Sequence, residues 1–337
     1  MARVTLADVA HAAGVSQATA SRAVNGSNRT VRPDLRERVL AAASALGYTP
    51  DANAQAMARG RTTSLGLVVH DIADPFFSTI AAGVSQAAEE AGLIVSLTET
   101  QGDPRREVEI VSLLDRQRAM AIVLAGTRLG DDADDAALLA ALEAYRGRGG
   151  QVALVGQRLG DLPVLAVDHR GGAAELAGAL VDLGYRRFAI AAGRPRHRTA
   201  AARVAAIRSE LAARGLPVPD DRVVHTDLTR TGGRAAAAAL LALAERPEVI
   251  MAVTDLMAVG VLGGIRDAGL RAPEDVAVTG FDDIEIASDV TPALTTVRLP
   301  LREIGQRLTA LALIPGGADA LEPVRGEVVV RESTPAR

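Results

Sequence analysis

A short segment near the N-terminus carries side chains suited to reading DNA. Gln17, Ala18 and Arg22 fall on the outer side of a helix expected from Ser16 to Val24. In the major groove glutamine pairs with the edge of adenine, arginine pairs with guanine, and short hydroxyl or amide side chains reach phosphates. The segment therefore predicts base contacts from these three residues and phosphate contacts from Ser16, Thr19, Ser21 and Asn25.

A second group of chemically useful residues follows the ends of predicted strands farther along the chain. Of only seven aromatic residues, three fall in these loops. Aromatic rings cover the apolar face of a sugar, and charged groups bind its hydroxyls, so the set favours a site for a polyhydroxylated ligand. Each of these residues also has a simpler interpretation. Asp74 and Asp255 could be helix N-caps, and Phe281 and Asp282 could serve in core packing and in a turn. The residues concerned are Asp74, Phe76, Phe77, Asp168, His169, Arg203, Asp255, Phe281 and Asp282.

Three short helices would hold the N-terminal reading face in place. Thr5 can cap the first helix, Gly14 supplies a turn, Ser16 caps the second, and Pro33 suits the first turn of the third. Two short helices joined by a tight glycine turn and supported by a third form a helix-turn-helix. A plain three-helix bundle with a solvated arginine face is the alternative. The third helix is expected to turn inward Leu35, Val39, Leu40, Ala42, Ala43 and Leu46.

The charge of the chain is divided unevenly. Residues 1–61 hold eight arginines and four acidic residues, a net charge of +4, and the remaining 276 residues carry −8. A small basic module on a larger acidic body suits contact with a polyanion. Because the acidic body itself holds 29 arginines, the composition supports the local pattern without identifying a function.

Composition also excludes several classes of protein. The 337 residues include no cysteine and no lysine, which removes disulfide frameworks, thiolate metal sites, P-loop lysines and Schiff-base lysines. The longest apolar run, residues 235–244, is half of what a membrane span requires. Charged residues stand where a signal peptide would be apolar. We expect a cytoplasmic protein with no metal, no cofactor and no membrane contact.

From residue 64 onward, predicted strands and helices alternate. Continuous apolar strands with helices between them indicate parallel sheets covered on both faces, and two successive sets predict two doubly wound subdomains. The fold class expected is a small all-α head followed by an α/β core that binds ligands at the carboxyl ends of its strands. Strands are expected at residues 65–69, 94–98, 121–125, 152–155, 164–167, 187–191, 223–225, 249–253, 276–279, 295–297 and 324–330.

The N-terminal motifs resemble the signature of the LacI/GalR family of transcriptional regulators. The matching stretches are TLADVA, AGVS, TASRAVNG and LGYTP, at residues 5–10, 13–16, 19–26 and 46–50, and the likeness extends over nearly the whole chain. The resemblance implies a hinge helix after Pro50 that orders on the operator, with Met57 as a wedge in the minor groove. A plain linker with a helical tendency is the alternative. The full set of expected DNA contacts also includes Thr5, Arg29, Asn53, Ala54 and Met57.

The resemblance also implies a core of the periplasmic-binding-protein type I fold, with an effector between its subdomains. It matches all the strand-end residues named above to effector positions except Phe77 and His169. His169, Ala206 and Thr254 depart from the asparagine, glycine and asparagine usual in the family, which argues against a common hexose as ligand. Arg32 stands where a serine or threonine usually caps the third helix.

The expected organisation follows from these segments. Residues 1–48 would form the helix-turn-helix domain, residues 49–62 the hinge helix or linker, and residues 63–337 the effector-binding and dimerisation core. Within the core, one subdomain is expected at about 63–162 and 293–322, and the other at about 163–291 and 323–337.

Together these features predict a homodimeric repressor that binds a pseudopalindromic operator and responds to a small polar effector, a sugar or sugar-like metabolite. One alternative is a cytoplasmic solute receptor without productive DNA binding, which the missing export signal and the intact segment 16–25 disfavour. The other is an α/β enzyme that uses carboxylates such as Asp282 and Asp283. The lack of a nucleophile elbow, a metal cluster and a lysine argues against it.

Overall fold

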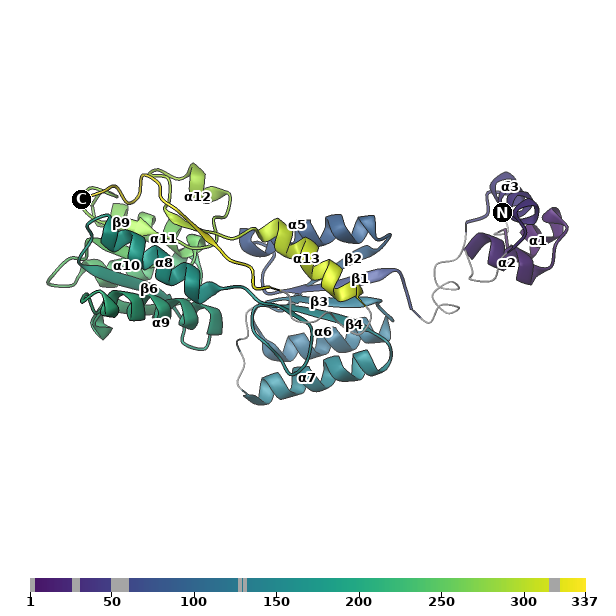
Figure 1. The fold of residues 1–337 in the computed structure, drawn as a ribbon, viewed down its shortest axis with the longest axis horizontal. Coiled ribbons are helices and arrows are strands. Elements are labelled where there is room, and N and C mark those ends of the chain that lie inside the picture. The colour runs from purple at the N-terminus through teal and green to yellow at the C-terminus, as the bar shows by residue number, and fades with distance from the viewer. Residues whose placement is uncertain (1–3, 26–30, 50–60, 127–128, 130–131, 315–321) are drawn as a thin grey trace. The chain divides into compact units, whose positions relative to one another are not determined.

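A computed structural model describes residues 4–25, 31–49, 61–126, 129, 132–314 and 322–337. The chain divides into two compact units, Met1–Thr63, here called the head, and Ser64–Arg337, here called the core (Figure 1). Each unit is described separately below. Among the described residues, no helix is both long and apolar enough to cross a membrane.

The described part of the head consists of α1 (Leu6–Ala13), α2 (Gln17–Asn25) and α3 (Pro33–Ala45). Thr5 caps α1, because its hydroxyl accepts from the Asp8 N–H while the Asp8 carboxylate accepts from the Thr5 N–H. Ser16 caps α2 by accepting from the Thr19 N–H at 3.2 Å. Gly14 between the two helices has a φ of 63°, in the left-handed region that favours glycine. The predicted caps and turn are confirmed.

The third helix buries fewer side chains than expected. Val39 and Ala43 are buried, but Leu40 and Leu46 are 45% and 38% exposed, so the prediction that these two leucines face inward is wrong. Successive helical residues are separated by about 100° around the axis, and Leu40 therefore points away from the stripe that contains Val39. The short helices α1 and α2 cover only that stripe.

The first sheet of the core is parallel, with strand order β2-β1-β3-β4-β5. Along β1, Leu65, Leu67 and Val69 face one hydrophobic cluster and Val68 faces another, because alternate side chains point to opposite faces of a strand. The strands are β1 (Ser64–Val69), β2 (Ile94–Glu99), β3 (Ala121–Ala125), β4 (Gln151–Val155) and β5 (Val164–Leu165).

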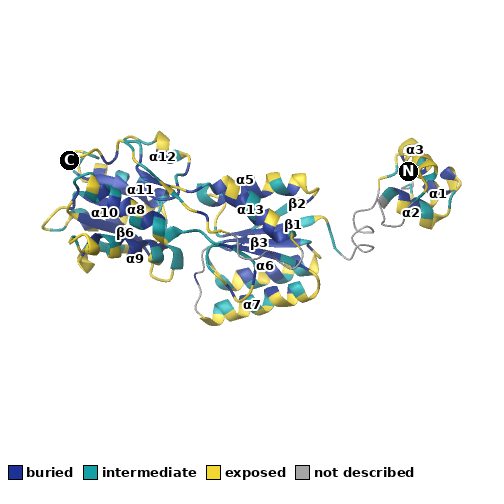
Figure 2. Ribbon diagram, in the orientation of Figure 1, coloured by how far each residue is buried: buried dark blue, intermediate teal, exposed yellow. Residues whose placement is uncertain are grey.

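Helices cover both faces of this sheet. On one face α5 (Pro75–Glu90) packs against α13 (Leu301–Leu313), which returns from the far end of the sequence to lie beside it (Figure 1). On the other face α6 (Pro104–Arg116) packs against α7 (Asp132–Gly147). The central strands are accordingly buried, as the dark blue of β3 shows in Figure 2.

The second sheet is also parallel, with strand order β7-β6-β8-β9. Its strands are β6 (Phe188–Gly193), β7 (Val223–Thr226), β8 (Val249–Ala252) and β9 (Ala277–Thr279). Its helices pack in two pairs, α8 (His169–Asp182) with α9 (Arg198–Ala213), and α10 (Arg230–Leu241) with α11 (Asp255–Asp267). Two short helices, η1 (Asp220–Arg222) and α12 (Ile286–Asp289), lie in its connections. The predicted pair of doubly wound parallel sheets is confirmed.

Crossing strands connect the two subdomains. Strands β10 (Thr296–Arg298) and β11 (Glu327–Val329) form an antiparallel pair, and isolated bridges join Val167 to Val324 and Asp282 to Arg298. The first subdomain is expected to stop near residue 162, but β5 pairs with β4, so its sheet extends to Leu165.

The close approach of α5 and α13 generates a prediction about stability. A Cβ built on Gly83 would lie 2.0 Å from the Arg302 carbonyl oxygen, a backbone atom that cannot move without shifting α13. We expect Gly83→Ala to lower the free energy of unfolding of the core by about 1–3 kcal/mol, as overpacking does. Urea denaturation measures this change.

Gly147→Ala is the matched control, because a Cβ at Gly147, the last residue of α7, would meet nothing within 4 Å. Its free energy of unfolding should stay the same or rise slightly through helix propensity. Equal stability of the two variants would contradict the tight contact between α5 and α13.

Candidate functional site

The outer face of α2 is the first candidate site. Ser16, Gln17, Ala18 and Arg22 are exposed, whereas Ala20 and Ala23 on the opposite face are buried. Arg22 makes no hydrogen bond or ion pair within the described part of the chain, so its guanidinium is available to an external acceptor. Arg38, in contrast, donates to the Ala13 carbonyl oxygen at 2.6 Å and ties α3 to the end of α1.

The other residues predicted to contact DNA differ in their exposure and their partners within the head. The Thr5 hydroxyl lies 2.7 Å from the Asp8 carboxylate in the cap of α1. Thr19 and Ser21 are partly buried. Arg32 does not cap α3 and instead pairs with Asp34 at 2.9 Å. The expected contacts Arg29, Asn53, Ala54 and Met57 lie outside the described residues, and the Asn25 side chain is likewise not described.

The second candidate site is a cavity of about 510 Å³ in the core. Its lining comes from loops at the carboxyl ends of strands in both sheets, together with the crossing residue Leu299 and Ile304 of α13. A volume between about 300 and 1,000 Å³ is typical of sites for small molecules. The expectation that ligands bind at the carboxyl ends of parallel strands therefore identified loops that line one cavity.

One wall of the cavity is the first turn of α5. Asp74 caps this helix, since its carboxylate accepts from the Phe76 N–H at 3.0 Å, and Pro75 follows as the first helical residue. The Phe76 and Phe77 rings meet edge to face with centroids 5.0 Å apart, and all three residues line the cavity. Burial raises the pKa of Asp74 above its ordinary value. The cap therefore sets an acceptor beside two aromatic rings.

The floor of the cavity is a buried ion pair. Arg203 of α9 donates to the Asp282 carboxylate, with Nη2 2.7 Å from Oδ1, and to the Val253 carbonyl oxygen at 2.6 Å. The guanidinium also lies 3.7 Å from the centre of the Phe281 ring. Both charged side chains are almost completely buried. Arg203 thereby joins α9 to the ends of β8 and β9.

His169 completes the floor as a neutral imidazole. Burial and the nearby charge of Arg203 hold the pKa of His169 well below its ordinary value. Its Nδ1 lies 3.1 Å from Arg203 Nη2, and because a guanidinium can only donate, Nδ1 is the acceptor. The proton of the neutral ring is therefore on Nε2, which makes this atom a hydrogen-bond donor.

Two buried carboxyl groups have raised pKa values. Burial raises the pKa of Asp282 to about 7 against the opposing charge of Arg203, with a further increase from Asp255. Burial raises the pKa of Asp255 to about 6, although its carboxylate accepts from the Thr296 hydroxyl at 2.6 Å and the Ile284 N–H at 2.9 Å.

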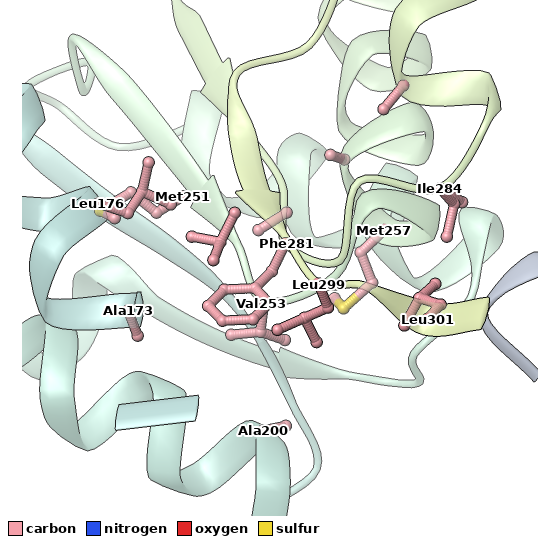
Figure 3. Close-up of a cluster of buried hydrophobic side chains, with 14 of the residues drawn as sticks. Ala173, Leu176, Ala200, Met251, Val253, Met257, Phe281, Ile284, Leu299 and Leu301 are labelled. Atoms are coloured by element: carbon pink, nitrogen blue, oxygen red, sulfur yellow. The ribbon is translucent and has the colours of Figure 1, made fainter. Parts of the chain in front are cut away.

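Three predicted ligand contacts do not line the cavity. Asp168 caps α8 by accepting from the Gly171 N–H. Asp255 is buried against Thr296, and the cap of α11 is Thr254 instead. Phe281 lies in an apolar cluster near Val253 and Leu299 (Figure 3). Phe281 thus has the packing role that was the alternative to ligand contact. The alternative role of Asp255 as an N-cap is wrong, because Thr254 caps α11.

The structure also places several unforeseen residues in the lining. Six of them follow strand ends, namely His70, Gln101, Gln157, Arg196, His197 and Asp227, and the seventh, Glu99, is the last residue of β2. The expectation that ligands bind at the carboxyl ends of parallel strands covers all seven, because His70 follows β1, Arg196 and His197 follow β6, and the others come from the ends of β2, β4 and β7.

Two polar contacts join the subdomains, and the residues of the first line the cavity. Gln157, after β4, donates to the Thr199 hydroxyl of α9 at 2.7 Å. Arg198 of α9 pairs with Asp135 of α7 at 2.8 Å. The first turn of α9 is therefore attached to the opposite subdomain.

Comparison with known proteins matches both units. Residues 5–51 match the family model described as bacterial regulatory proteins, lacI family, and residues 177–334 match the periplasmic binding protein-like domain. Catabolite control protein A of Priestia megaterium is 30% identical over 311 residues, which are 90% of this chain and 89% of that protein. GalR of Salmonella typhimurium strain LT2 is 31% identical over 315 residues, 93% of this chain and 90% of that protein.

Solved structures give the same result. A complex of the transcriptional regulator CelR with cellobiose has a TM-score of 0.69 at 32% identity, and covers 98% of this chain and 100% of that one. The lac repressor dimer bound to operator and the anti-inducer ONPF has a TM-score of 0.84 at 27% identity. This match covers 99% of this chain and 100% of that one.

The raised pKa values generate a prediction about pH. Asp282 and Asp255 titrate near 7 and 6 in the folded core but near 4 when unfolded, so the folded state binds more protons in this window. Stability should therefore fall as pH rises from about 4 to 7, by up to ~1.4 kcal/mol per pH unit for each group. In Asp282→Asn the slope of the free energy of unfolding should be smaller, as urea denaturation at pH 5, 6, 7 and 8 would measure.

Asp220→Asn serves as the control, because the Asp220 side chain is 89% exposed and should leave the slope unchanged. A slope in Asp282→Asn equal to that of the wild type would show that Asp282 does not titrate in this range.

Proposed function

The chain belongs to the LacI family of bacterial regulatory proteins, and on this basis we propose that it represses transcription from an operator read by α2, under control of an effector in the core cavity. Its relatives are regulators and not enzymes. One combination of features carries the proposal. The α2 face is exposed and its Arg22 has no partner among the described residues, and the same chain has a cavity at the carboxyl ends of the strands of two sheets.

In this proposal α2 lies in the major groove. Gln17, Ala18 and Arg22 contact base edges, and the exposure of all three supports this role. The hydroxyl of Ser16 remains at the start of the helix, where N–H groups and short side chains meet phosphates. The further contacts proposed are Thr5, Thr19, Ser21, Asn25 and Arg29 in the head and Asn53, Ala54 and Met57 in the hinge.

The cavity is the proposed effector site. CelR binds cellobiose in its solved complex, and we extend to this chain a ligand of the same general kind, a sugar or sugar-like metabolite. The direct contacts proposed are those expected residues that line the cavity: Asp74, Phe76, Phe77, His169, Arg203 and Asp282. Asp168, Asp255 and Phe281 support these side chains from behind through a cap, a buried hydrogen-bond network and ring packing.

Coupling between the two sites depends on the arrangement of the subdomains. We propose a homodimer, as in the lac repressor complex, with heads at residues 1–48, hinges at 49–62 and cores at 63–337 on a pseudopalindromic operator. A ligand that contacts both walls of the cavity stabilises one relative position of the subdomains, and the contacts Gln157–Thr199 and Arg198–Asp135 belong to that position. Such coupling is typically worth about 1–3 kcal/mol.

The test is a gel shift with the promoter DNA adjacent to the gene. The full-length chain should bind this DNA at modest salt, and one of a set of sugars should change the affinity. Absence of binding under every ligand and salt condition would overturn the proposal.

Arg22→Ala should weaken specific binding in the same assay by about 1–3 kcal/mol for each head and should relax specificity, because it removes a bidentate contact to guanine. Effector affinity, measured by calorimetry, should not change. Arg105→Ala removes an exposed arginine of α6 and is the charge-matched control. Equal loss of DNA and effector binding in Arg22→Ala would indicate unfolding instead of a lost base contact.

Asp74→Ser tests the effector site. Serine keeps an acceptor for the cap of α5 but removes the carboxylate, so affinity should fall about tenfold or more while the unfolding temperature changes little. The measurement uses whichever compound best stabilises the wild type in a thermal-shift screen of sugars, nucleosides and small acids.

Asp103→Ser is the matched control, because Asp103 caps α6 in the same way, precedes a proline and lies outside the cavity. Similar affinities in the two variants would remove Asp74 from the proposed site.

A further inference from the structure

The turn between β6 and α9 forms one corner of the cavity, and within the described residues the Arg196 guanidinium and His197 Nδ1 of this turn have no hydrogen-bond partner. Helix α9 begins there, and its N-cap residue, His197, makes no side-chain capping hydrogen bond. The first N–H groups of a helix have no acceptor within the helix, and its N-terminus carries a partial positive charge. Thr199 and Ala200 of this first turn line the cavity.

Among the residues that the structure describes, two buried nitrogen atoms, one at this corner and one on the cavity floor, have no hydrogen-bond partner. They are His197 Nδ1 and Arg203 Nε, both on residues that line the cavity. Arg203 is only 2% exposed, so water reaches it poorly. Buried polar atoms in native proteins are nearly always hydrogen-bonded, and an unsatisfied one points to a missing acceptor. Arg203 can only donate, and His197 donates as its Nδ1–H tautomer.

The corner also has an excess of positive charge, because Arg194, Arg196 and Arg198 are close together and Asp227 is near both Arg194 and Arg196. Arg194 is neutralised by Asp227, with two hydrogen bonds, and Arg198 by Asp135. Arg196 lines the cavity between them and makes no hydrogen bond or ion pair with the residues that the structure describes. An external anion would therefore find a free guanidinium at the start of α9.

The opposite wall has the reverse character. Asp71, Asp74 and Glu99 come from the ends of β1 and β2 and supply acceptors for hydroxyl groups. A ligand that satisfies both walls has hydroxyls at one end and a negative charge at the other.

We propose that the effector is an anionic polyhydroxylated compound whose carboxylate or phosphate binds at the start of α9 against Arg196 and His197. This inference rests on the proposed function of the cavity as the effector site and specifies the class of its ligand. The hydroxyls face Asp74 and the rings of Phe76 and Phe77, and the anionic group accepts from Arg196, His197 and the first turn of α9. This assignment is consistent with the departures at His169 and Thr254 from the family pattern.

The first experiment uses inorganic phosphate as the probe on the full-length chain. Phosphate should raise the unfolding temperature of the core above that in chloride of equal ionic strength. In Arg196→Gln the increase should be lost, and in Arg170→Gln, which removes an exposed arginine of α8 outside the cavity, it should persist. No increase in the wild type, or an equal one in Arg196→Gln, overturns the proposal.

A second experiment separates the two sources of charge. Calorimetry compares glucuronate and glucose 6-phosphate with glucose, and we expect one acid to bind about tenfold tighter than the neutral sugar, with the difference abolished in Arg196→Gln. A gain for glucuronate assigns a carboxylate, and a gain for glucose 6-phosphate assigns a phosphate. If glucose binds as tightly as both, the proposal is overturned.

A gel shift with the same proteins distinguishes this inference from the proposed function. If the wild type binds operator but phosphate does not raise its unfolding temperature, the proposal of an anionic ligand is overturned and the proposed repressor function stands. Loss of operator binding in the wild type contradicts the proposed function itself.

Discussion

The buried ion pair of Arg203 and Asp282 is the interaction on which the cavity depends. Its two charges lie in a nearly water-free site, and removal of either partner would leave the other uncompensated. The pair connects α9 with the ends of β8 and β9, and it fixes the backbone of Asp282 at a φ of 112°, which is rare for residues other than glycine. The floor of the cavity is therefore attached to α9 and to the ends of two strands at once.

The same turn connects the cavity to the crossing strands. The Asp282 N–H donates to the Val297 carbonyl oxygen at 2.9 Å. The Asp283 carboxylate accepts from Arg298 and Arg331, each at 2.7 Å, and these charges lower the pKa of Asp283 although its partial burial acts in the opposite direction. A ligand that contacts Asp282 thus acts one residue away from the ion pairs that fix the strands between the subdomains.

The scarcity of aromatic residues has a consequence for packing throughout the core. With only 2% aromatic residues, the interior is filled by short aliphatic side chains, and helices come close enough for backbone contact at glycine. A Cβ on Gly233 would lie 2.0 Å from the Met257 carbonyl oxygen, and one on Gly260 would lie 2.0 Å from that of Arg230. These contacts hold α10 against α11, as Gly83 holds α5 against α13. Close packing of this kind transmits small displacements between helices.

Local signals in the sequence determined much of this protein. The caps at Thr5, Ser16 and Asp74, the turn at Gly14 and the alternation of strands and helices all depend on residues a few positions apart, and the structure has each of them. The meeting of strand ends at one cavity follows from the direction of parallel strands.

Only the tertiary structure decided which side chains face that cavity. Asp255 and Asp282 both follow strand ends and look equivalent in the sequence, yet Asp282 lines the cavity and Asp255 is buried beneath it. The difference arises from contacts with distant residues. Thr296, 41 residues away, donates a hydrogen bond to Asp255, whereas Arg203, 79 residues away, donates to Asp282 at the cavity floor. Leu40 is exposed for a related reason, since the neighbouring helices set how much of α3 is covered. Contacts between distant segments decide such orientations, and neither periodicity nor turn chemistry encodes them.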